Sequence, residues 1–279
     1  CILLQAGPTG ALVNCANIFY APIIAELGFS NSQLSINTTI RILFMALGMF
    51  IGPHFYDKVG FKRFLGFNMI LQAFCFSLQG MFTKLFHWYL MAPLLGLASG
   101  ALITVPATLL INNWFVKDRG LFLGIVLAFA GVSGAVFSPL ISTLISHFGW
   151  RSAVVILSVI VLAIGLSSLF LLKYQPEGDE KPYGELSDVI EKEKKEKKNA
   201  SKPIFYICVL ITIVMNSVIQ LTYQFSLLTS QMGLSLAMTA ALTSFAMVGN
   251  TAGKVVFGYL KDRFGSFKHR PRQRDNVSH

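Results

Sequence analysis

The most regular feature of this 279-residue sequence is a series of long apolar stretches separated by short polar ones. Each stretch has about 20 residues, enough to cross the hydrocarbon core of a bilayer as a helix. Helices are expected because an open strand leaves its backbone polar groups unpaired in lipid. The eight predicted spans are 1–24, 34–56, 64–82, 88–111, 120–145, 152–172, 204–229 and 236–260.

A segment of different composition, 173–202, separates the sixth span from the seventh. It holds eight Lys and eight Asp or Glu residues, which predicts a solvated linker. Within it, 186–198 can form a charged surface helix through Glu–Lys pairs four residues apart. The predicted units are a six-helix bundle over 1–172, the linker over 173–202, two helices of a second bundle over 203–260, and a loop with a polar tail over 261–279.

Short basic clusters follow the second, fourth and eighth spans, on the same side of the membrane as the linker. The opposite side has Lys84 and Arg151 between its spans. Because basic loops are retained in the cytoplasm, the pattern predicts a multi-pass plasma-membrane protein with a cytoplasmic linker. The basic clusters consist of Lys58, Lys62, Arg63, Lys117, Arg119, Lys261 and Arg263.

Composition supports lipid as the surrounding medium. Hydrophobic residues make up 54% of the sequence and charged residues 13%, about half the charged share of a soluble domain. The lipid bilayer is therefore the expected partner of the apolar surface. The net charge of +10 would suit nucleic acid, but no basic face alternates with aromatic residues, so no nucleic-acid partner is expected.

The sequence lacks the patterns that carry enzyme chemistry. It has no H-E-x-x-H pair, no phosphate-binding G-x-x-x-x-G-K loop and no G-x-S-x-G turn. The four cysteines, Cys1, Cys15, Cys75 and Cys208, lie in apolar stretches without C-x-x-C spacing. We therefore expect no catalysis, no metal site and no cofactor.

Two loops resemble each other across the linker. The first, after the second span, reads Gly52-Pro-His-Phe-Tyr-Asp57-Lys58-Val-Gly60-Phe-Lys62-Arg63. The other, after the eighth span, reads Gly258-Tyr-Leu-Lys-Asp262-Arg263-Phe-Gly265-Ser-Phe-Lys268. They share the core Asp-(Lys/Arg)-x-Gly-x-x-(Lys/Arg). A repeat at equivalent points of two halves is typical of duplicated transporters.

These loops resemble the G-x-x-x-D-R-x-G signature of the major facilitator superfamily, which follows the second and eighth helices. The second loop matches in full, whereas the first has Pro53 in place of the leading glycine and Gly52 one position early. The resemblance covers nearly the whole chain. It implies an all-α membrane protein of the major facilitator fold, here a six-helix N-terminal bundle with the first two helices of the C-terminal bundle. The stretches that resemble the monocarboxylate and oxalate/formate transporter branch are Trp114-Phe-Val-Lys-Asp-Arg119-Gly-Leu-Phe-Leu-Gly124, Gly131-Val-Ser-Gly134, Pro139 and Phe148-Gly-Trp-Arg151.

An acidic side chain in such a loop can face the positive end of a neighbouring helix. We expect Asp262 to meet the start of the fifth span near Arg119 and to hold the cytoplasmic side shut, while Asp57 needs a counterpart outside this chain. The alternative is that both loops are short basic turns that only obey topology. The expected gating motif consists of Asp57, Lys58, Gly60, Lys62, Arg63, Gly258, Asp262, Arg263, Gly265 and Arg119.

Arg41 lies well inside the second span. An unpaired arginine that faces lipid at mid-bilayer costs about 2.5 kcal/mol or more. We therefore expect Arg41 to face the cavity, where it can attract a carboxylate. The alternatives are that it reaches outward to water or pairs with Glu26.

Lys254 lies two turns before Asp262 in the eighth span. The monocarboxylate-type family has a substrate-pairing basic residue four positions before the motif glycine, and Lys254 has this place relative to Gly258. Where the family often has an acid one turn earlier, this chain has Asn250, which cannot titrate. The resemblance thus implies anion binding at Lys254, and the departure at Asn250 weakens the case for proton coupling. The alternative is that Lys254 reaches to the cytosol.

Uncharged polar residues on the first and seventh spans complete the expected substrate site. On the seventh span they follow i, i+4, i+7 spacing and share a helix face. A polar stripe in lipid must turn toward protein or water, so it lines the cavity, which we favour, or packs between helices. These residues are Asn14, Asn17, Asn216, Gln220 and Tyr223.

Pairs of glycines four positions apart predict close contacts between helices. The four pairs are Gly48 with Gly52, Gly96 with Gly100, Gly120 with Gly124, and Gly249 with Gly253.

Together these features predict a secondary transporter for small organic anions, such as monocarboxylates, oxalate or formate, working by alternating access as a symporter or an antiporter. We expect the chain to be incomplete, because superfamily members have twelve spans and 268–276 is polar where a ninth would begin. Its expected partners are then the missing C-terminal helices or a full-length parent, and alone it is expected to transport nothing. The alternatives are a non-transporting membrane sensor or regulatory partial copy, and an intramembrane enzyme.

Overall fold

The computed structural model describes residues 1–115, 119–174, 183 and 232–267, and for residues 57, 236 and 257–267 it describes the backbone alone. The predicted seventh span and most of the linker lie outside this part. Every regular element in the described ranges is helical, which confirms the predicted all-α membrane fold. Within the described residues, five segments are long and apolar enough to cross a membrane, namely Ile2–Leu27, Asn31–Tyr56, Phe61–Met81, Leu85–Trp114 and Arg119–Leu171.

The first span is not one regular helix. It consists of α1 (Ile2–Leu4), the π-helix η1 (Gln5–Val13), the 3-10 helix η2 (Ala16–Phe19) and α2 (Tyr20–Leu27). Pro8 lies inside η1, and because proline has no N–H the regular ladder cannot pass through it. Irregular backbone at membrane depth is tolerated where protein covers it, and η1 is almost entirely buried.

Side chains of neighbouring helices bind carbonyl oxygens of η1. Ser133 donates a short hydrogen bond to the oxygen of Ala6, and Gln72 Nε2 donates to the oxygen of Pro8 at 3.4 Å. The fourth span has a second break at Ile103, whose oxygen accepts a hydrogen bond from Gln5. The breaks in the first and fourth spans are therefore joined directly.

The second and third spans form a hairpin of helices. Helix α3 (Asn31–Val59) begins with a capping box, in which Ser30 Oγ accepts from Gln33 N and Gln33 Oε1 accepts from Ser30 N. Gly60 alone connects α3 to α4 (Phe61–Leu78), which continues as η3 (Gln79–Met81). Gly60 has φ +93°, a backbone conformation that favours glycine. The two helices are therefore connected by a tight turn at this glycine.

The remaining described spans occur in the predicted order, except that two of them belong to one helix. The fourth span contains α5 (Leu85–Leu102) and α6 (Val105–Trp114). Helix α7 (Arg119–Leu171) contains both the fifth and the sixth spans, which are separated by a kink at Gly149 (φ +74°, ψ +160°). Helix α10 (Leu236–Phe267) begins where the eighth span was predicted and runs seven residues past its expected end at Leu260.

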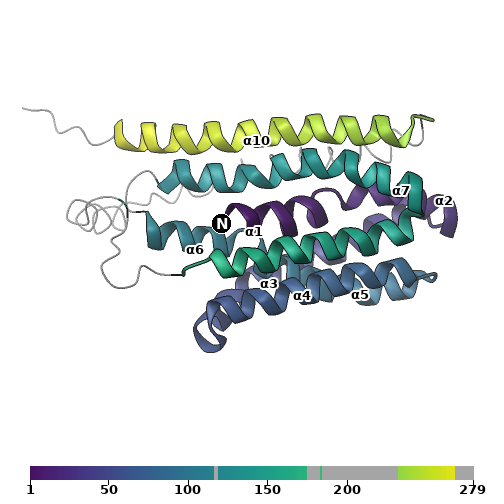
Figure 1. The fold of residues 1–279 in the computed structure, drawn as a ribbon, viewed down its shortest axis with the longest axis horizontal. Helices are drawn as coiled ribbons and strands as arrows, with labels where there is room; N and C mark the ends of the chain where they lie inside the picture. The colour runs from purple at the N-terminus through teal and green to yellow at the C-terminus, as the bar shows by residue number, and fades with distance from the viewer. Residues whose placement is uncertain (116–118, 175–182, 184–231, 268–279) are drawn as a thin grey trace, which may run out of the picture.

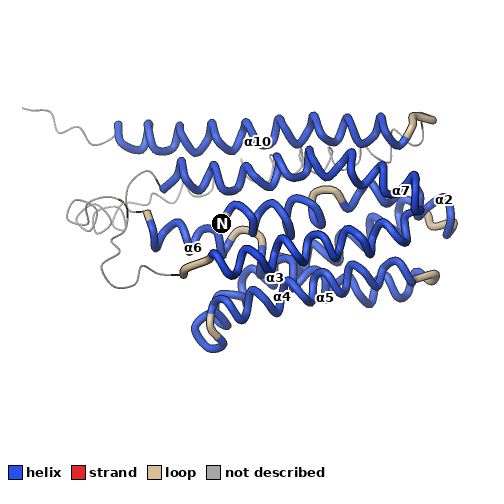
Figure 2. The backbone as a smooth tube through the Cα atoms, in the orientation of Figure 1, coloured by secondary structure: helices blue, strands red, loops and turns tan. Residues whose placement is uncertain are grey.

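The helices lie nearly side by side, as Figures 1 and 2 show. Helix α10 runs along the first half of α7 at one edge of the molecule, and α3 and α5 pack together at the opposite edge (Figure 1). We call the end that carries Lys58, Lys62, Arg63 and Arg119 the basic end, and the end that carries Glu26, Gly80 and Arg151 the far end.

Glycines bring α3 and α5 into backbone contact, as two of the four predicted pairs require. A Cβ added at Gly48 would lie 2.5 Å from the backbone oxygen of Leu97. A Cβ added at Gly100 would collide with the oxygen of Met45, and one added at Gly96 would collide with the oxygen of Arg41. The pair Gly249 and Gly253 differs, because in the described part of the chain nothing lies within 4 Å of a Cβ built at either position. The contact predicted for this pair is therefore not found there.

Candidate functional site

The first half of α7 is lined with small residues that let two other helices approach it closely. From the first span, Gly10 lies so near that an added Cβ would be 2.6 Å from Ser133 Oγ. From the other side, a Cβ on Gly131 would meet the Thr251 hydroxyl of α10 and lie 2.8 Å from the oxygen of Met247. The first span, α7 and α10 therefore meet at one place, which we call the three-helix junction.

Polar side chains of α10 donate to backbone oxygens of α7 along this junction. Ser244 Oγ donates to the oxygen of Ala135 at 2.9 Å, and Thr251 Oγ1 donates to that of Ala128 at 3.2 Å. Each hydroxyl also donates to an oxygen of its own helix four residues earlier. Since donors toward the end of α10 reach acceptors toward the start of α7, the two helices are antiparallel. Sequence reasoning missed Ser244 and Thr251, because helical hydroxyls usually bond their own backbone.

Lys254 continues this row of contacts. Its Nζ donates to the oxygen of Leu127 at 3.2 Å, and the side chain is half-buried. Among the described residues no carboxylate pairs with Lys254. Lys254 lies in the predicted eighth span, where a charged side chain is expensive unless it is paired or faces water. Its hydrogen bond to Leu127 uses one of the three donors of the ammonium group.

The first span adds two of the predicted polar residues to the junction. Asn14 Nδ2 donates to the oxygen of Ala130 on α7 at 3.1 Å. Asn17 is buried in η2, which also packs against α10. Asn250 is half-buried one helical turn before Lys254 and shares its face. Asn14, Asn17, Asn250 and Lys254 therefore all belong to the elements that meet at the three-helix junction.

Other predicted substrate residues do not join this group. Asn216, Gln220 and Tyr223 lie outside the described residues. Arg41 is half-buried and lines a small pocket inside the first bundle, together with residues of the first span, α4, α5 and the second half of α7. Its substrate contact stays a prediction.

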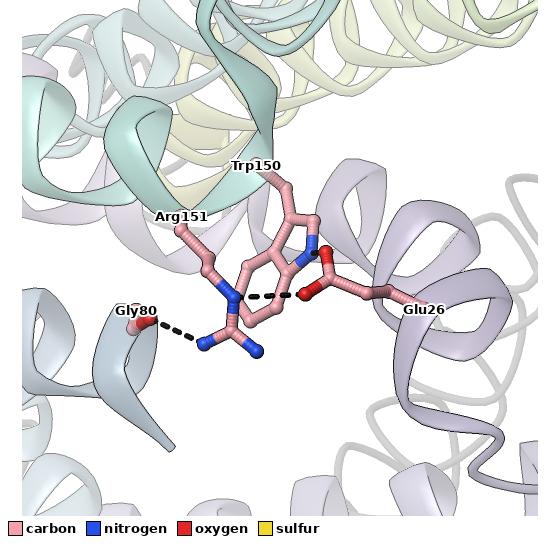
Figure 3. Close-up of polar contacts among 4 residues, drawn as sticks. All are labelled: Glu26, Gly80, Trp150 and Arg151. Carbon is pink, nitrogen blue, oxygen red and sulfur yellow. Dashed lines mark hydrogen bonds and ion pairs between the residues drawn. The ribbon is translucent and has the colours of Figure 1, made fainter. Parts of the chain in front are cut away.

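The alternative pairing of Arg41 with Glu26 is wrong, because Glu26 has other partners (Figure 3). Glu26 Oε1 accepts from Arg151 Nε at 2.9 Å, and Glu26 Oε2 accepts from Trp150 Nε1 at 2.5 Å. Arg151 also donates to the oxygen of Gly80 at 2.7 Å and lies over the Trp150 ring. This cluster joins the first, third and sixth spans at the far end. From the sequence, Arg151 was placed between two spans and in the Phe148-Gly-Trp-Arg151 stretch, but no partner was predicted for it. The available signal was that Glu26 is predicted at the same membrane surface.

The gating motif is described only in part. Lys58, Lys62 and Arg63 are exposed at the basic end around Gly60. Arg119 begins α7 and donates from Nε to the oxygen of Phe115 at 2.6 Å. The backbone of Gly258, Asp262, Arg263 and Gly265 continues α10, and the side chains at these positions and at Asp57 lie outside the description.

Comparisons with known proteins agree with this architecture. A family model described as "Major Facilitator Superfamily" matches residues 2–272. The MFS-type transporter pynF of Aspergillus niger is 24% identical over 268 residues, which cover 95% of this chain and 60% of that protein. The probable sulfoacetate transporter SauU of Cupriavidus necator is 25% identical over 256 residues, covering 87% of this chain and 59% of that protein.

A shorter match supports the same branch that the motifs resemble. Monocarboxylate transporter 13 of Bos taurus is 28% identical over 145 residues, which cover 52% of this chain and 34% of that protein. The chain thus spans at most about 60% of the length of these relatives. The family match over nearly the whole sequence, and a helical fold with membrane-spanning segments, show that this chain is an integral membrane protein of the Major Facilitator Superfamily.

Proposed function

We propose that the protein is a secondary active transporter that moves small organic anions across the plasma membrane by alternating access. The observation that supports this most is the position of Lys254, a cation within a span that contacts a carbonyl oxygen at the three-helix junction. Relatives named for monocarboxylate and sulfoacetate transport point to the same class of cargo. An ammonium group binds a carboxylate or sulfonate through charge-assisted hydrogen bonds.

The substrate site in this proposal is built from Lys254 and the amides of Asn14, Asn17 and Asn250. Lys254 supplies the charge, and the amides supply hydrogen bonds that orient the anion. An asparagine cannot release a proton, so Lys254 is the one titratable side chain of this group. The polar face predicted for Asn216, Gln220 and Tyr223 on the seventh span completes this proposed site.

The gate in this proposal lies at the basic end, which we place in the cytoplasm together with the linker. The antiparallel contacts pair 244 with 135, 251 with 128 and 254 with 127. Continued by two more turns, the same register brings position 262 of α10 opposite the start of α7 at Arg119. Asp262 can then interact with the positive end of α7, and this contact would break when the two bundles rock apart.

Equilibrium binding of radiolabelled lactate to the purified chain in lipid nanodiscs tests this proposal. We expect saturable binding that oxalate, formate and sulfoacetate displace, because each carries the charge that Lys254 recognises. Lactamide has the same shape without the charge and should not displace the label. Binding that lactamide displaces as well as the anions do, or no displaceable binding for any anion, would contradict the proposal.

A further inference from the structure

Arg41 is a charge inside the first bundle for which the described residues provide no partner. It lies ten residues into α3, about 15 Å from the start of that helix at the rise of an α-helix. It has no ion pair and no side-chain hydrogen bond to any residue that the structure describes. Glu26 is the one acidic side chain within the described part, and Arg151 and Trp150 occupy both of its oxygens. No described carboxylate therefore balances the Arg41 guanidinium.

The pocket that Arg41 lines contains two more polar groups that have no hydrogen-bond partner among the described residues. Trp88 is 2% exposed and Asn37 is 5% exposed. Neither Trp88 Nε1 nor Asn37 Oδ1 has a hydrogen-bond partner in the described residues. An indole N–H can only donate, so the group missing beside Trp88 is an acceptor. The Asn37 amide can turn its NH2 group to the pocket by rotation about its last torsion.

The chemistry of the pocket selects a small anion. Arg41 and Trp88 offer only donors, and the Gln79 side chain on the same wall can also donate through its amide. The rest of the wall is mainly aromatic and aliphatic, including Phe19 and Phe76, and an apolar wall strengthens the attraction between an enclosed anion and the guanidinium.

The size of the pocket limits the guest to a single small ion. Its free space is about that of one water molecule, which is too small for lactate or sulfoacetate. Chloride is slightly larger than water and enters with a small movement of the half-buried Arg41 side chain. The pocket lies next to the far-end cluster, since Gln79 precedes Gly80 and the Trp88 ring centroid is 6.4 Å from that of Trp150. It is thus separate from Lys254, which lies on α10.

We propose that this pocket is a chloride site within the first bundle, in which the ion neutralises Arg41 and accepts a hydrogen bond from Trp88. Because Arg41 belongs to α3 and Trp88 to α5, bound chloride links these two helices beside the first span. Because an ion that binds only the folded protein stabilises it by mass action, chloride should raise the unfolding temperature. This role is independent of the organic anion proposed for the three-helix junction.

Thermal unfolding of the purified chain in nanodiscs, in sodium chloride and in sodium gluconate of equal ionic strength, tests the proposal. We expect a saturable rise of the unfolding midpoint with chloride, reproduced by bromide and absent with gluconate, which is too large. In Arg41→Met and Trp88→Phe the apparent dissociation constant for chloride should rise about tenfold or more. Lys84→Met, which removes an exposed cation at the far end, should respond as the parent does.

A second measurement serves if the Arg41 variant does not fold. Line broadening of the chloride-35 NMR signal by the parent chain should be reversed by bromide and should be weak in Trp88→Phe, which retains an aromatic ring. The proposal is overturned if chloride and gluconate give the same midpoint, which is the outcome expected for a pocket that holds only water. It is equally overturned if a folded Arg41→Met variant keeps the full chloride response.

Discussion

The Gly100→Leu variant is expected to lose about 3 kcal/mol of unfolding free energy, the upper part of the usual range for overpacking. At Gly100 even a Cβ would collide with the backbone oxygen of Met45, so a leucine forces α3 and α5 apart. Backbone cannot move aside as a flexible side chain does, and in lipid close packing is a main source of helix association.

Titration with SDS from mixed micelles, monitored by tryptophan fluorescence, measures this loss. Gly249→Leu is the matched control, because in the described part of the chain nothing lies within 4 Å of a Cβ at that position. We expect the control to unfold near the midpoint of the parent. Equal midpoints for Gly100→Leu and Gly249→Leu would show that α3 and α5 do not pack through these glycines.

The Lys254→Gln variant is expected to bind lactate about 100-fold more weakly than the parent, because a hydrogen bond to a charged group contributes about 1.5–3 kcal/mol. Glutamine keeps a donor for the oxygen of Leu127 but removes the charge that the anion requires. Lys254→Arg keeps the charge and should recover most of the affinity. Binding of radiolabelled lactate in nanodiscs measures all three proteins.

Thr251→Val separates the charge of Lys254 from the packing of the junction. Valine has nearly the shape of threonine and removes the hydrogen bond to Ala128, one turn from Lys254. We expect this variant to lose some stability but to keep its preference for lactate over lactamide. If Lys254→Gln binds lactate as tightly as the parent does, Lys254 is not the anion-binding group.

The first six spans were predictable because hydropathy reports burial in lipid, but the breaks within the first and fourth were not predicted. The first span reads as one apolar run, yet Pro8 lies in a π-helix. In the fourth span, Pro106 just inside the start of α6 was an overlooked signal of a new helix. Helix α10 runs past Leu260 because charged residues continue a helix well once it leaves the apolar region.

Single residues of the candidate site were predicted from the sequence, but their hydrogen-bond partners were not. Lys254 and Asn14 stand out because polar groups are rare in spans, but both bind backbone oxygens of α7. Every residue has such an oxygen, so the sequence carries no signal for which one accepts. Glu26 and Arg151 are 125 positions apart, and only the folded chain brings them together.

Disulfide cross-linking between α7 and α10 tests whether these two helices meet at the three-helix junction. A Cβ at Gly131 lies 3.4 Å from that of Thr251, close to the usual separation in a disulfide, about 3.8 Å. The pair Gly131→Cys and Thr251→Cys is introduced after Cys1, Cys15, Cys75 and Cys208 are replaced by serine. The membranes are then oxidised, and a lysine-specific protease cuts the linker.

We expect the two fragments on either side of the linker to stay joined on a non-reducing gel and to separate when a reductant is added. The control pair, Gly131→Cys with Gly249→Cys, should give separate fragments under both conditions. Separate fragments from the 131/251 pair under oxidising conditions would contradict the junction on which the proposed transport site depends.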